Sequence, residues 1–478
     1  QMNLFKDMVC YQEEVRDPSR MAEVLNRVIE KAIRGSAPAQ INVPRDYWTQ
    51  VIDIELPPIV RFERQGGGKD AIQRAAKMLS DAKFPVILSG AGVVIGDAIN
   101  ECKALAEKLD APVCNGYQHN DSFPGSHPLA VGPLGYNGSK AAMQLISKAD
   151  VVLALGTRLN PFSTLPGYGI DYWPKNANII QVDMNPDRIG LTKKVTVGIA
   201  GDAKQVAKQI FDKLSSNAGD SGREDRKNLI HQTKSAWLQT LTSLDHEDDD
   251  PGTVWNKEAR ERDKDRMSPR QAWRAIQAAM PEDAIISSDI GNNCAIGNAY
   301  PTFEKPRKYL APGLFGPCGY GFPSILGAKI GCPDTPVIGF AGDGAFGISM
   351  NEMSSCAREE WPAITMVIFR NYQWGAEKRN SILWFDDNFV GTELDPELSY
   401  AKVANACGLK GVTVKTMEET TKAIKQSCDD QKKGITTFIE VILNQELGEP
   451  FRRDAMKKPV QVAGISKTDM KPQKGISN

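Results

Sequence analysis

The stretch Val337-Ile-Gly-Phe-Ala-Gly342-Asp343-Gly344 joins a short apolar run to a turn in which glycines flank an aspartate. A run of this kind, with a helix expected to start near Ile348, is typical of a strand that is buried on both faces of a parallel sheet. In such sheets ligands lie at the carboxyl ends of the strands, where glycines let a phosphate approach backbone N–H groups. The stretch therefore predicts an α/β domain with a ligand site near Asp343.

A second polar residue follows the next apolar run. Asn371 lies 28 positions beyond Asp343, just past the end of the run Ile364–Phe369. Two neighbouring strand ends would then present a carboxylate and a carboxamide oxygen to one point. That pair suits Mg²⁺, which prefers octahedral oxygen ligands and commonly shares them with phosphates. The alternative is a strand-end turn, for which Asp-Gly and Asn are equally natural.

Apolar runs of strand length recur in two parts of the chain, separated by helical patterns. They are Pro85–Gly90, Val151–Leu155 and Ile179–Asp183 in the first part, and Ala284–Asp289, Val337–Phe340, Ile364–Phe369 and Phe438–Ile442 in the second. Strands that alternate with helices imply parallel pairing. The predicted fold class is therefore α/β, with doubly wound parallel-sheet domains at residues 70–215 and 267–455.

The segment before these domains has a different pattern. Residues 1–55 contain apolar positions at helical spacing over 20–34 and an alternating run at Ala39–Val43, which predict a helix and a strand. The glycines Gly66-Gly67-Gly68 have the composition of a linker. A domain is therefore expected to begin just after them.

Two further segments lack the alternation of the domains. Residues 216–266 are dominated by Ser, Asp, Glu, Lys and Arg, which predicts a linker with a helix in it. Residues 456–478 are rich in Lys and lack periodicity, so we expect a C-terminal tail that wraps a surface or is frayed.

Composition excludes several classes of function. Among the 478 residues, 58 Lys and Arg balance 59 Asp and Glu, so no global field recruits nucleic acid or an acidic membrane surface. No apolar run approaches the roughly 20 residues that span a bilayer, and the N-terminal residues lack the basic region followed by an apolar stretch that is typical of a signal peptide. The nine cysteines are scattered and form no C-x-x-C pair, which predicts reduced thiols and a cytoplasmic location.

The spacing from Gly342-Asp343-Gly344 to Asn371 resembles the cofactor and metal signature of thiamine-diphosphate-dependent enzymes. The resemblance implies that Asp343, Asn371 and the backbone carbonyl of Gln373 bind Mg²⁺. Arg370 departs from the signature, which usually has an asparagine there, although that member is not a metal ligand. The residues implied to bind thiamine diphosphate in this segment are Gly342, Gly344, Ala345 and Phe346.

Two upstream segments extend the resemblance. Gly313–Pro323 is similar to the segment that grips the aminopyrimidine ring, and it places Cys318 where these enzymes usually carry a bulky apolar prop. Cys318 is smaller than that prop, and the alternative is a small buried apolar residue. Ser288–Asn293 resembles the second loop that cradles the diphosphate, with Gly291, Asn292 and Asn293 as the implied cofactor-binding residues.

Nearly the entire chain is similar to one family of these enzymes, the sulfoacetaldehyde acetyltransferases. The segments that carry this similarity are Gly116–Asp121, Gly156–Pro161, Arg370–Asn380 and Gln445–Arg452. The resemblance implies three α/β domains in the order pyrimidine-binding, central and diphosphate-binding. Residues 1–55 would be the C-terminal remnant of the first domain, which is incomplete in this chain.

The resemblance also implies an activity and partners. The enzyme converts sulfoacetaldehyde and phosphate to acetyl phosphate and sulfite in the degradation of taurine and related sulfonates, and its full-length form is expected to be a homodimer or homotetramer. Both substrates are anions, so cationic groups must bind them. The candidates are Lys378 and Arg379, with Trp374 and Tyr372 as walls of the channel, and the alternative for the two cations is a solvated turn. His119 is either a proton shuttle or a structural histidine of its loop.

Two other functions fit parts of the sequence. A pyruvate-using relative, of the acetolactate synthase or pyruvate oxidase type, would share the same metal signature but would be expected to bind a flavin. A non-catalytic fragment could bind a nucleotide through Gly90-Ala-Gly92, which follows an apolar run.

The glutamate that activates the cofactor in this superfamily has no counterpart in the chain. Glu13 and Glu14 follow no matching motif, and a solvated helix face explains them better. We therefore expect the 478-residue chain by itself to bind the cofactor poorly and to be inactive. Sulfite release in the presence of Mg²⁺ and thiamine diphosphate checks this, and robust turnover would overturn it.

Overall fold

The structure, a computed structural model, describes residues 1–58, 63–243, 263–313, 315–358, 360–384 and 388–447. It divides into two compact units, Gln1–Arg64 and Gln65–Asn478. The expected tail, residues 456–478, lies outside the described residues, as does part of the expected linker, residues 244–262. Within the described part of the chain, no helix is long and apolar enough to cross a membrane.

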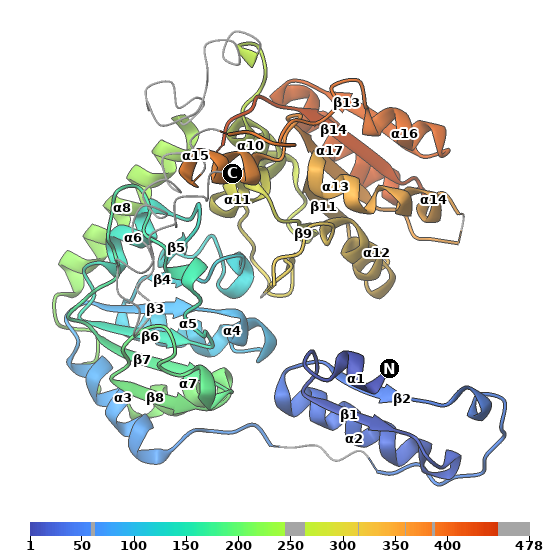
Figure 1. Ribbon diagram of the computed structural model, residues 1–478. Coiled ribbons are helices and arrows are strands. Elements are labelled where there is room, and N and C mark those ends of the chain that lie inside the picture. The colour runs from blue at the N-terminus through green and yellow to red at the C-terminus, as the bar shows by residue number, and fades with distance from the viewer. Residues whose placement is uncertain (59–62, 244–262, 314, 359, 385–387, 448–478) are drawn as a thin grey trace, which may run out of the picture. The chain divides into compact units, whose positions relative to one another are not determined.

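The first unit is a parallel pair of short strands with a helix packed against it (Figure 1). Its elements are α1 (Met2–Phe5), β1 (Tyr11–Glu14), η1 (Pro18–Arg20), α2 (Met21–Gly35), β2 (Ala39–Asn42) and η2 (Arg45–Tyr47). The helix and the strand predicted at 20–34 and 39–43 are thus confirmed by α2 and β2. Three buried valines, Val15, Val24 and Val28, form the core of the unit.

The two glutamates expected on a helix lie on strand β1 instead. Glu13 pairs with Ile41 of β2 in the register of the sheet, and its carboxylate accepts hydrogen bonds from Arg27 at 2.8 Å. The side chain of Glu14 accepts from Asn42 at 2.9 Å. The helix expectation was wrong because the pairing of these residues with β2 is a long-range contact that local pattern does not reveal.

The central domain is built on a six-stranded parallel sheet of order β5-β4-β3-β6-β7-β8. Its strands are β3 (Pro85–Ser89), β4 (Val113–Asn115), β5 (Ala130–Pro133), β6 (Val151–Leu155), β7 (Asn178–Asp183) and β8 (Val197–Ala200). Its helices are α3 (Lys69–Asp81), α4 (Ala91–Ile95), α5 (Ile99–Leu109), η3 (Asn120–Ser122), α6 (Lys140–Ile146), η4 (Pro161–Thr164), η5 (Pro186–Arg188) and α7 (Ala203–Lys213). The strand order reverses between β3 and β6, as in a doubly wound fold.

At this switch point, the loops that follow β3 and β6 are in close contact through glycines. The amide of Gly92 donates to the carbonyl of Gly156 at 2.8 Å, and a Cβ at Gly92 would lie only 2.6 Å from the Cα of Gly156. A Cβ at Gly90 would lie 2.6 Å from the same carbonyl oxygen. The glycines that suggested a nucleotide site therefore have a packing reason, because any larger residue would push the loops apart.

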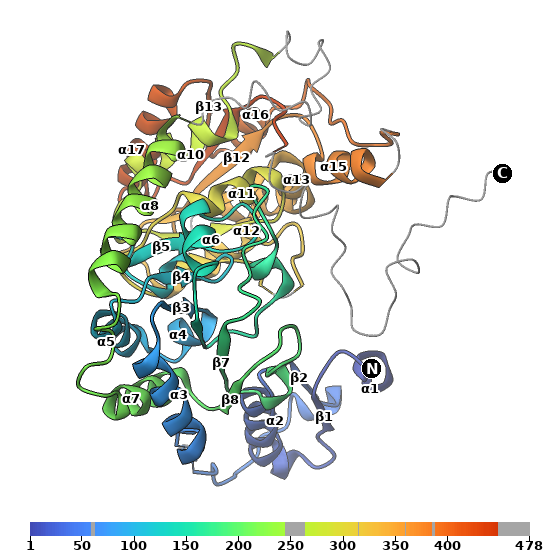
Figure 2. The same ribbon diagram turned by 90° about the vertical axis from the view of Figure 1, so that its left-hand side faces the viewer.

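The C-terminal domain is built on a second six-stranded parallel sheet, of order β10-β9-β11-β12-β14-β13 (Figures 1 and 2). Its strands are β9 (Ile285–Ser288), β10 (Tyr309–Leu310), β11 (Val337–Gly342), β12 (Thr365–Arg370), β13 (Lys410–Val414) and β14 (Thr437–Ile442). Its helices are α10 (Pro269–Ala279), α11 (Asn292–Ile296), η6 (Gly297–Ala299), α12 (Gly321–Gly331), α13 (Asp343–Ser349), η7 (Met350–Glu352), α14 (Met353–Cys356), α15 (Gly375–Trp384), α16 (Tyr400–Ala406) and α17 (Met417–Gln431).

The apolar strands of this sheet supply two separate cores, one on each face. Val367 and Phe369 of β12 join Trp273 of α10 in one core, whereas Met366 and Ile368 join Phe322 and others in the second. Successive side chains of a strand point to opposite faces, so a strand buried on both sides is apolar at most positions. This confirms the doubly wound α/β class.

Helix α8 (Arg223–Ser243), in the expected linker, packs into two cores. Ile230 belongs to the core of the central domain, whereas Trp237 and Leu241 belong to that of the C-terminal domain. Near its start, the buried guanidinium of Arg226 donates five hydrogen bonds of 2.6–3.0 Å to backbone carbonyls. The acceptors are Lys83, Leu109, Asp110, Gly219 and Ser221. All five N–H donors of the side chain are therefore used.

Replacement of Arg226 by lysine is expected to destabilise the protein, because a single ammonium has three donors and cannot reach five carbonyls. Carbonyls left buried without donors should cost roughly 2–4 kcal/mol. Chemical denaturation measures the change in the free energy of unfolding. The matched control is Arg223→Lys, whose partly exposed ion pairs with Asp110 and Asp220 should change stability by less than about 1 kcal/mol.

Candidate active site

The site lies where β9, β11 and β12 end at one edge of the C-terminal sheet. Asp289 follows β9, Asp343 follows β11 and Asn371 follows β12. The order of the sheet reverses between β9 and β11, which is where open α/β sheets bind their ligands. Helix α13 begins directly at Asp343 rather than near Ile348, because an aspartate in the first turn satisfies free backbone amides.

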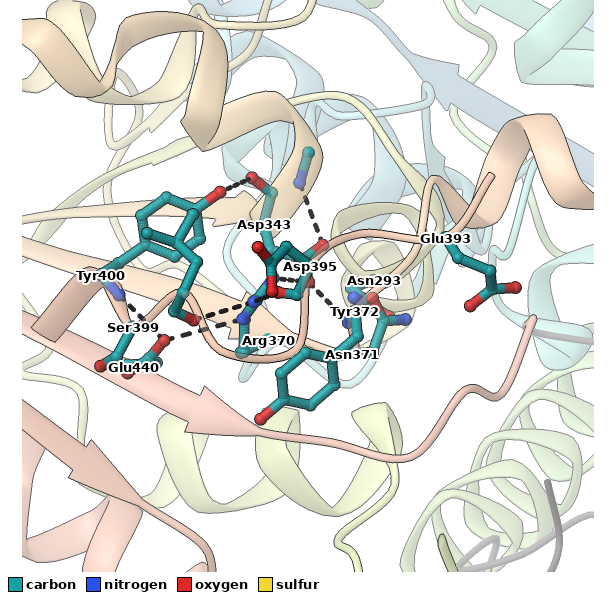
Figure 3. A network of polar contacts seen from close by, with 12 residues as sticks. Asn293, Asp343, Arg370, Asn371, Tyr372, Glu393, Asp395, Ser399, Tyr400 and Glu440 are labelled. Atoms are coloured by element: carbon teal, nitrogen blue, oxygen red, sulfur yellow. Dashed lines mark hydrogen bonds and ion pairs between the residues drawn. The ribbon is translucent and has the colours of Figure 1, made fainter. Parts of the chain in front are cut away.

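The carboxylate of Asp343 is buried and held by three donors (Figure 3). One oxygen accepts from the guanidinium of Arg370 at 3.1 Å and from the amide of Tyr372 at 2.6 Å. The other oxygen accepts from the adjacent amide of Gly344 at 3.0 Å. Burial raises the pKa of Asp343 to about 6, although Arg370 and the amides act in the opposite direction. The carboxylate therefore contacts the residues on both sides of Asn371.

The backbone of the loop after β12 is strained at Tyr372. Its φ of +62° lies in the left-handed region, which an aromatic residue rarely adopts. The conformation is held by the bond from its amide to Asp343 and by antiparallel pairing of the loop with Thr392–Leu394. Strain of this kind is common where a chain must present side chains to a ligand.

Two amide side chains at this loop, those of Gln373 and Asn292, each have one buried atom without a hydrogen-bond partner among the described residues. The carboxamide nitrogen of Asn371 donates to Asn293 at 3.5 Å, and that of Gln373 donates to the carbonyl of Gln445 at 3.1 Å. Among the described residues, Oε1 of Gln373 and Nδ2 of Asn292 have no hydrogen-bond partner. Buried polar groups are normally satisfied, so these atoms fit a polar ligand at the strand ends.

Two glycines leave room for such a ligand. A Cβ at Gly291 or at Gly342 would meet no atom within 4 Å, and Gly291 has a φ of +136° that other residues rarely adopt. Gly291 follows β9, and Gly342 is the last residue of the neighbouring strand β11. Among the described residues, no group of three or more His, Cys, Asp and Glu could hold a metal. A cation here would therefore depend on amide and carbonyl oxygens and on oxygens of the ligand itself.

The residues after Asp343 divide between the site and the core. The indole of Trp374 lies against Gly344, where a Cβ would be 2.8 Å from the ring. Ala345 is buried, and Phe346 packs against Phe322 and Tyr400 in the core. The side chain of Phe346 therefore faces away from the strand ends, and only its backbone is available to a ligand.

The segment around Cys318 is tied to β9 through Asp289. The buried carboxylate of Asp289 accepts from the amides of Gly319 at 3.1 Å and of Gly321 at 2.7 Å. Cys318 is half-buried, and burial, with Asp289 and Glu377 nearby, raises the pKa of its thiol. The thiol thus stays protonated near the site at neutral pH.

The two expected anion-binding cations differ in their surroundings. Both lie on α15, a helix, so the alternative of a solvated turn is wrong. The ammonium of Lys378 contacts the carboxylate of Glu393 and the side chain of Gln445. Arg379 is almost fully buried. Lys378 therefore lies in a charged cluster at the site, whereas Arg379 points into the protein.

His119 lies in a loop of the central domain after β4. Burial lowers its pKa to about 4, and the charge of Arg158 acts in the same direction, so the ring is neutral at neutral pH. The neighbouring Asn120 donates to the carbonyls of Asn298 and Pro301, each at 2.8 Å, and joins the two domains. No contact between the His119 side chain and the Asp343 cluster occurs in the described part of the chain.

The structure adds residues that the sequence reasoning missed. Glu440 lies 3.8 Å from Nε of Arg370, and its carboxylate accepts from Ser399 at 2.6 Å. The hydroxyl of Tyr400 donates to the backbone carbonyl of Asp343 at 2.8 Å. The one signal was a carboxylate inside the apolar run Phe438–Ile442. Buried charges are rarely retained without a partner, so its position could have indicated a buried cation nearby.

The left-handed backbone at Tyr372 generates a prediction about two substitutions. Tyr372→Gly should be more stable than Tyr372→Ala by about 1 kcal/mol, because only glycine adopts this φ without strain. Both variants lose the ring, so their difference isolates the backbone. The free energy of unfolding from chemical denaturation measures it. An alanine variant as stable as the glycine variant would show that the loop is not strained in solution.

Comparison with known proteins gives the family. Residues 72–210 match the family model described as thiamine pyrophosphate enzyme, central domain, and residues 289–441 match the thiamine pyrophosphate enzyme, C-terminal TPP binding domain. The chain is 78% identical to a probable sulfoacetaldehyde acetyltransferase of Rhizobium meliloti (strain 1021) over 474 residues, which cover 99% of this chain and 80% of that protein. It is 74% identical to a sulfoacetaldehyde acetyltransferase of Roseovarius nubinhibens, over 99% of this chain and 78% of that protein.

A solved structure supports the same fold. The benzoylformate decarboxylase of Polynucleobacter necessarius is similar with a TM-score of 0.72 at 20% identity, over 94% of this chain and 78% of that one. At this identity the likeness concerns the fold alone, whereas the relatives above resemble the chain along almost its whole length. The chain belongs to the sulfoacetaldehyde acetyltransferase family, and it carries the central and cofactor-binding domains of a thiamine-diphosphate-dependent enzyme.

Proposed function

We propose that the protein is an acetyltransferase that converts sulfoacetaldehyde and phosphate to acetyl phosphate and sulfite with thiamine diphosphate as cofactor. The observation that carries the proposal is the 78% identity to a probable sulfoacetaldehyde acetyltransferase over 99% of the chain. The matched 474 residues include the loops after β11 and β12, where the substrate-facing residues are expected.

The residues at the strand ends fit the cofactor and its metal. Asp343, Asn371 and the backbone carbonyl of Gln373 would hold Mg²⁺, a hard cation that shares oxygen ligands with a diphosphate. A diphosphate beside it is supported by the open positions at Gly291 and Gly342 and by Nδ2 of Asn292, which has no hydrogen-bond partner among the described residues. Asn293, Gly344 and Ala345 complete the proposed cofactor-binding set, with Phe346 contributing backbone only. Cys318, beside Asp289, is the proposed prop of the ring.

When bound, thiamine diphosphate would supply a carbanion for attack on the aldehyde carbon and an acceptor for the electron pair of the reacting bond. The protein's residues orient the reactants and bind their charge. Trp374 lies on Gly344 and would form a wall beside the reacting carbon. Lys378 would bind a sulfonate or phosphate oxygen in exchange for its contact with the exposed carboxylate of Glu393, which would keep its hydrogen bond from Gln445.

Arg379 and His119 have weaker support as catalytic groups. Arg379 is buried, so its proposed role is to place positive charge behind Lys378 rather than to touch substrate. His119 is neutral at neutral pH and lies in a loop that binds the C-terminal domain through Asn120, which favours the structural alternative.

We further propose that the protein works in the cytoplasm as a homodimer or homotetramer on small-molecule substrates, without nucleic acid or membrane partners. The net charge of -1 and the nine cysteines, all of them free, support this. Light scattering of the purified protein measures the oligomeric state.

The test of the proposed function is product formation by the longest form of the protein that its gene encodes. With sulfoacetaldehyde, phosphate, Mg²⁺ and thiamine diphosphate, we expect equal amounts of sulfite and acetyl phosphate, and no turnover without phosphate. Lys378→Met should lower kcat/KM by about 10–100-fold, because it removes a charge-assisted hydrogen bond. Lys378→Arg, which keeps the charge, should lose less. Pyruvate consumption without sulfite release from sulfoacetaldehyde would contradict the assignment.

A further inference from the structure

Arg370 places a buried positive charge beside the proposed metal site. Its side chain is 1% exposed and donates to the carboxylate of Asp343 at 3.1 Å. A cation bound at Asp343 would meet this guanidinium at short range in a site from which water is excluded, where like charges repel strongly. A second negative charge close to Arg370 would therefore favour binding of Mg²⁺ at Asp343.

Glu440 supplies that charge. Its side chain is 3% exposed, and its carboxylate lies 3.8 Å from Nε of Arg370 (Figure 3). Three donors hold it in place, namely the hydroxyls of Ser399 and Thr413 at 2.6 and 3.2 Å and the amide of Tyr400 at 3.1 Å. With all these donors supplied by the protein, the carboxylate is held in one position.

The sheet dictates this arrangement. Glu440 of β14 pairs with Ile368 of β12, and Arg370 lies two residues further along the same strand. Side chains two residues apart project from one face, so Arg370 and Glu440 point to the same side. That side carries α13 and α16, from which Tyr400 donates to the backbone of Asp343.

The remaining donors of Arg370 leave its guanidinium one orientation. Its second terminal nitrogen donates to the carbonyls of Asp395 and Leu398, and its plane lies over the ring of Tyr372 with 4.2 Å to the centroid. The planar fork can then direct only one N–H at Asp343. Oδ2 of Asp343 is occupied by Arg370 and Tyr372, whereas Oδ1 accepts only the adjacent amide among the described residues.

We propose that Arg370 and Glu440 act together as positioning residues for a divalent cation: Arg370 fixes the carboxylate of Asp343 in one orientation, and Glu440 cancels the charge of Arg370 so that the cation is not repelled. This rests on the proposed role of Asp343 as a metal ligand. The three residues carry a net charge of −1 at the site, which Glu440→Gln changes to zero and which the double variant Arg370→Gln/Glu440→Gln restores.

The experiment is a calorimetric titration of Mg²⁺ into the metal-free protein, in its longest encoded form and with saturating thiamine diphosphate. Glu440→Gln should raise the dissociation constant for Mg²⁺ about tenfold, because an uncompensated cation then faces the metal. The double variant should bind Mg²⁺ more tightly than Glu440→Gln, because the uncompensated guanidinium is gone, but less tightly than the parent, because Arg370 no longer orients Asp343. A matched control is Asp430→Asn, which removes another buried carboxylate, paired with Lys410 in the same domain, and should leave Mg²⁺ binding unchanged.

The outcomes distinguish an effect of charge on Mg²⁺ binding from a loss of folded structure. If Glu440→Gln binds Mg²⁺ as the parent does, or if the double variant binds no better than Glu440→Gln, the pair does not act through its charge and the proposal fails. Glu440→Asp keeps the charge and should stay within about threefold of the parent, which guards against loss of folding in the glutamine variant. If Asp343→Asn binds Mg²⁺ normally, the metal assignment itself fails, and the positioning proposal fails with it.

Discussion

The contact on which the site depends is the buried bond between the carboxylate of Asp343 and the guanidinium of Arg370. The two residues lie at the ends of adjacent parallel strands, and register pairing of Gly342 with Phe369 brings them together. An isolated buried carboxylate would take up a proton. The guanidinium of Arg370 and the amide of Tyr372 are therefore needed to keep Asp343 charged. The proposed Mg²⁺, and through it the diphosphate, depends on the negative charge of Asp343.

Burial of such a cluster is costly, and the surrounding fold supplies what it requires. Two apolar cores pack against the two faces of the sheet and hold the ends of its strands in fixed relative positions. The central domain is held to the same edge by polar bonds, including those from Asn120 to Asn298 and from the amides of Lys308 and Tyr309 to Asp121. Helix α8 contributes to both cores. Buried ionic groups of this kind specify one arrangement more than they add stability.

Local pattern predicted much of the fold and part of the site. The continuous apolar runs predicted β3, β6, β7, β9, β11, β12 and β14, because strands buried on both faces are apolar at most positions. The Gly-Asp-Gly turn and Asn371 were placed at strand ends, and the structure brings Asp343 into contact with both neighbours of Asn371. One expectation was wrong because of a long-range contact: Glu13 and Glu14 pair with a strand rather than lie on a helix. For Lys378 and Arg379, the alternative of a solvated turn is wrong because both lie on helix α15.

The sequence by itself determined the α/β class, the two parallel sheets and the chemical types at their ends, because strand burial and turn chemistry are local properties that leave a local pattern. Only the tertiary structure decided that Arg370 faces Glu440 and Asp343, that Tyr372 takes a left-handed backbone and that Trp374 covers Gly344. Those features depend on register between strands and on loops packed from distant parts of the chain. Residues 70 positions apart leave no periodic trace of their contact, since strand pairing brings them together only in the folded protein.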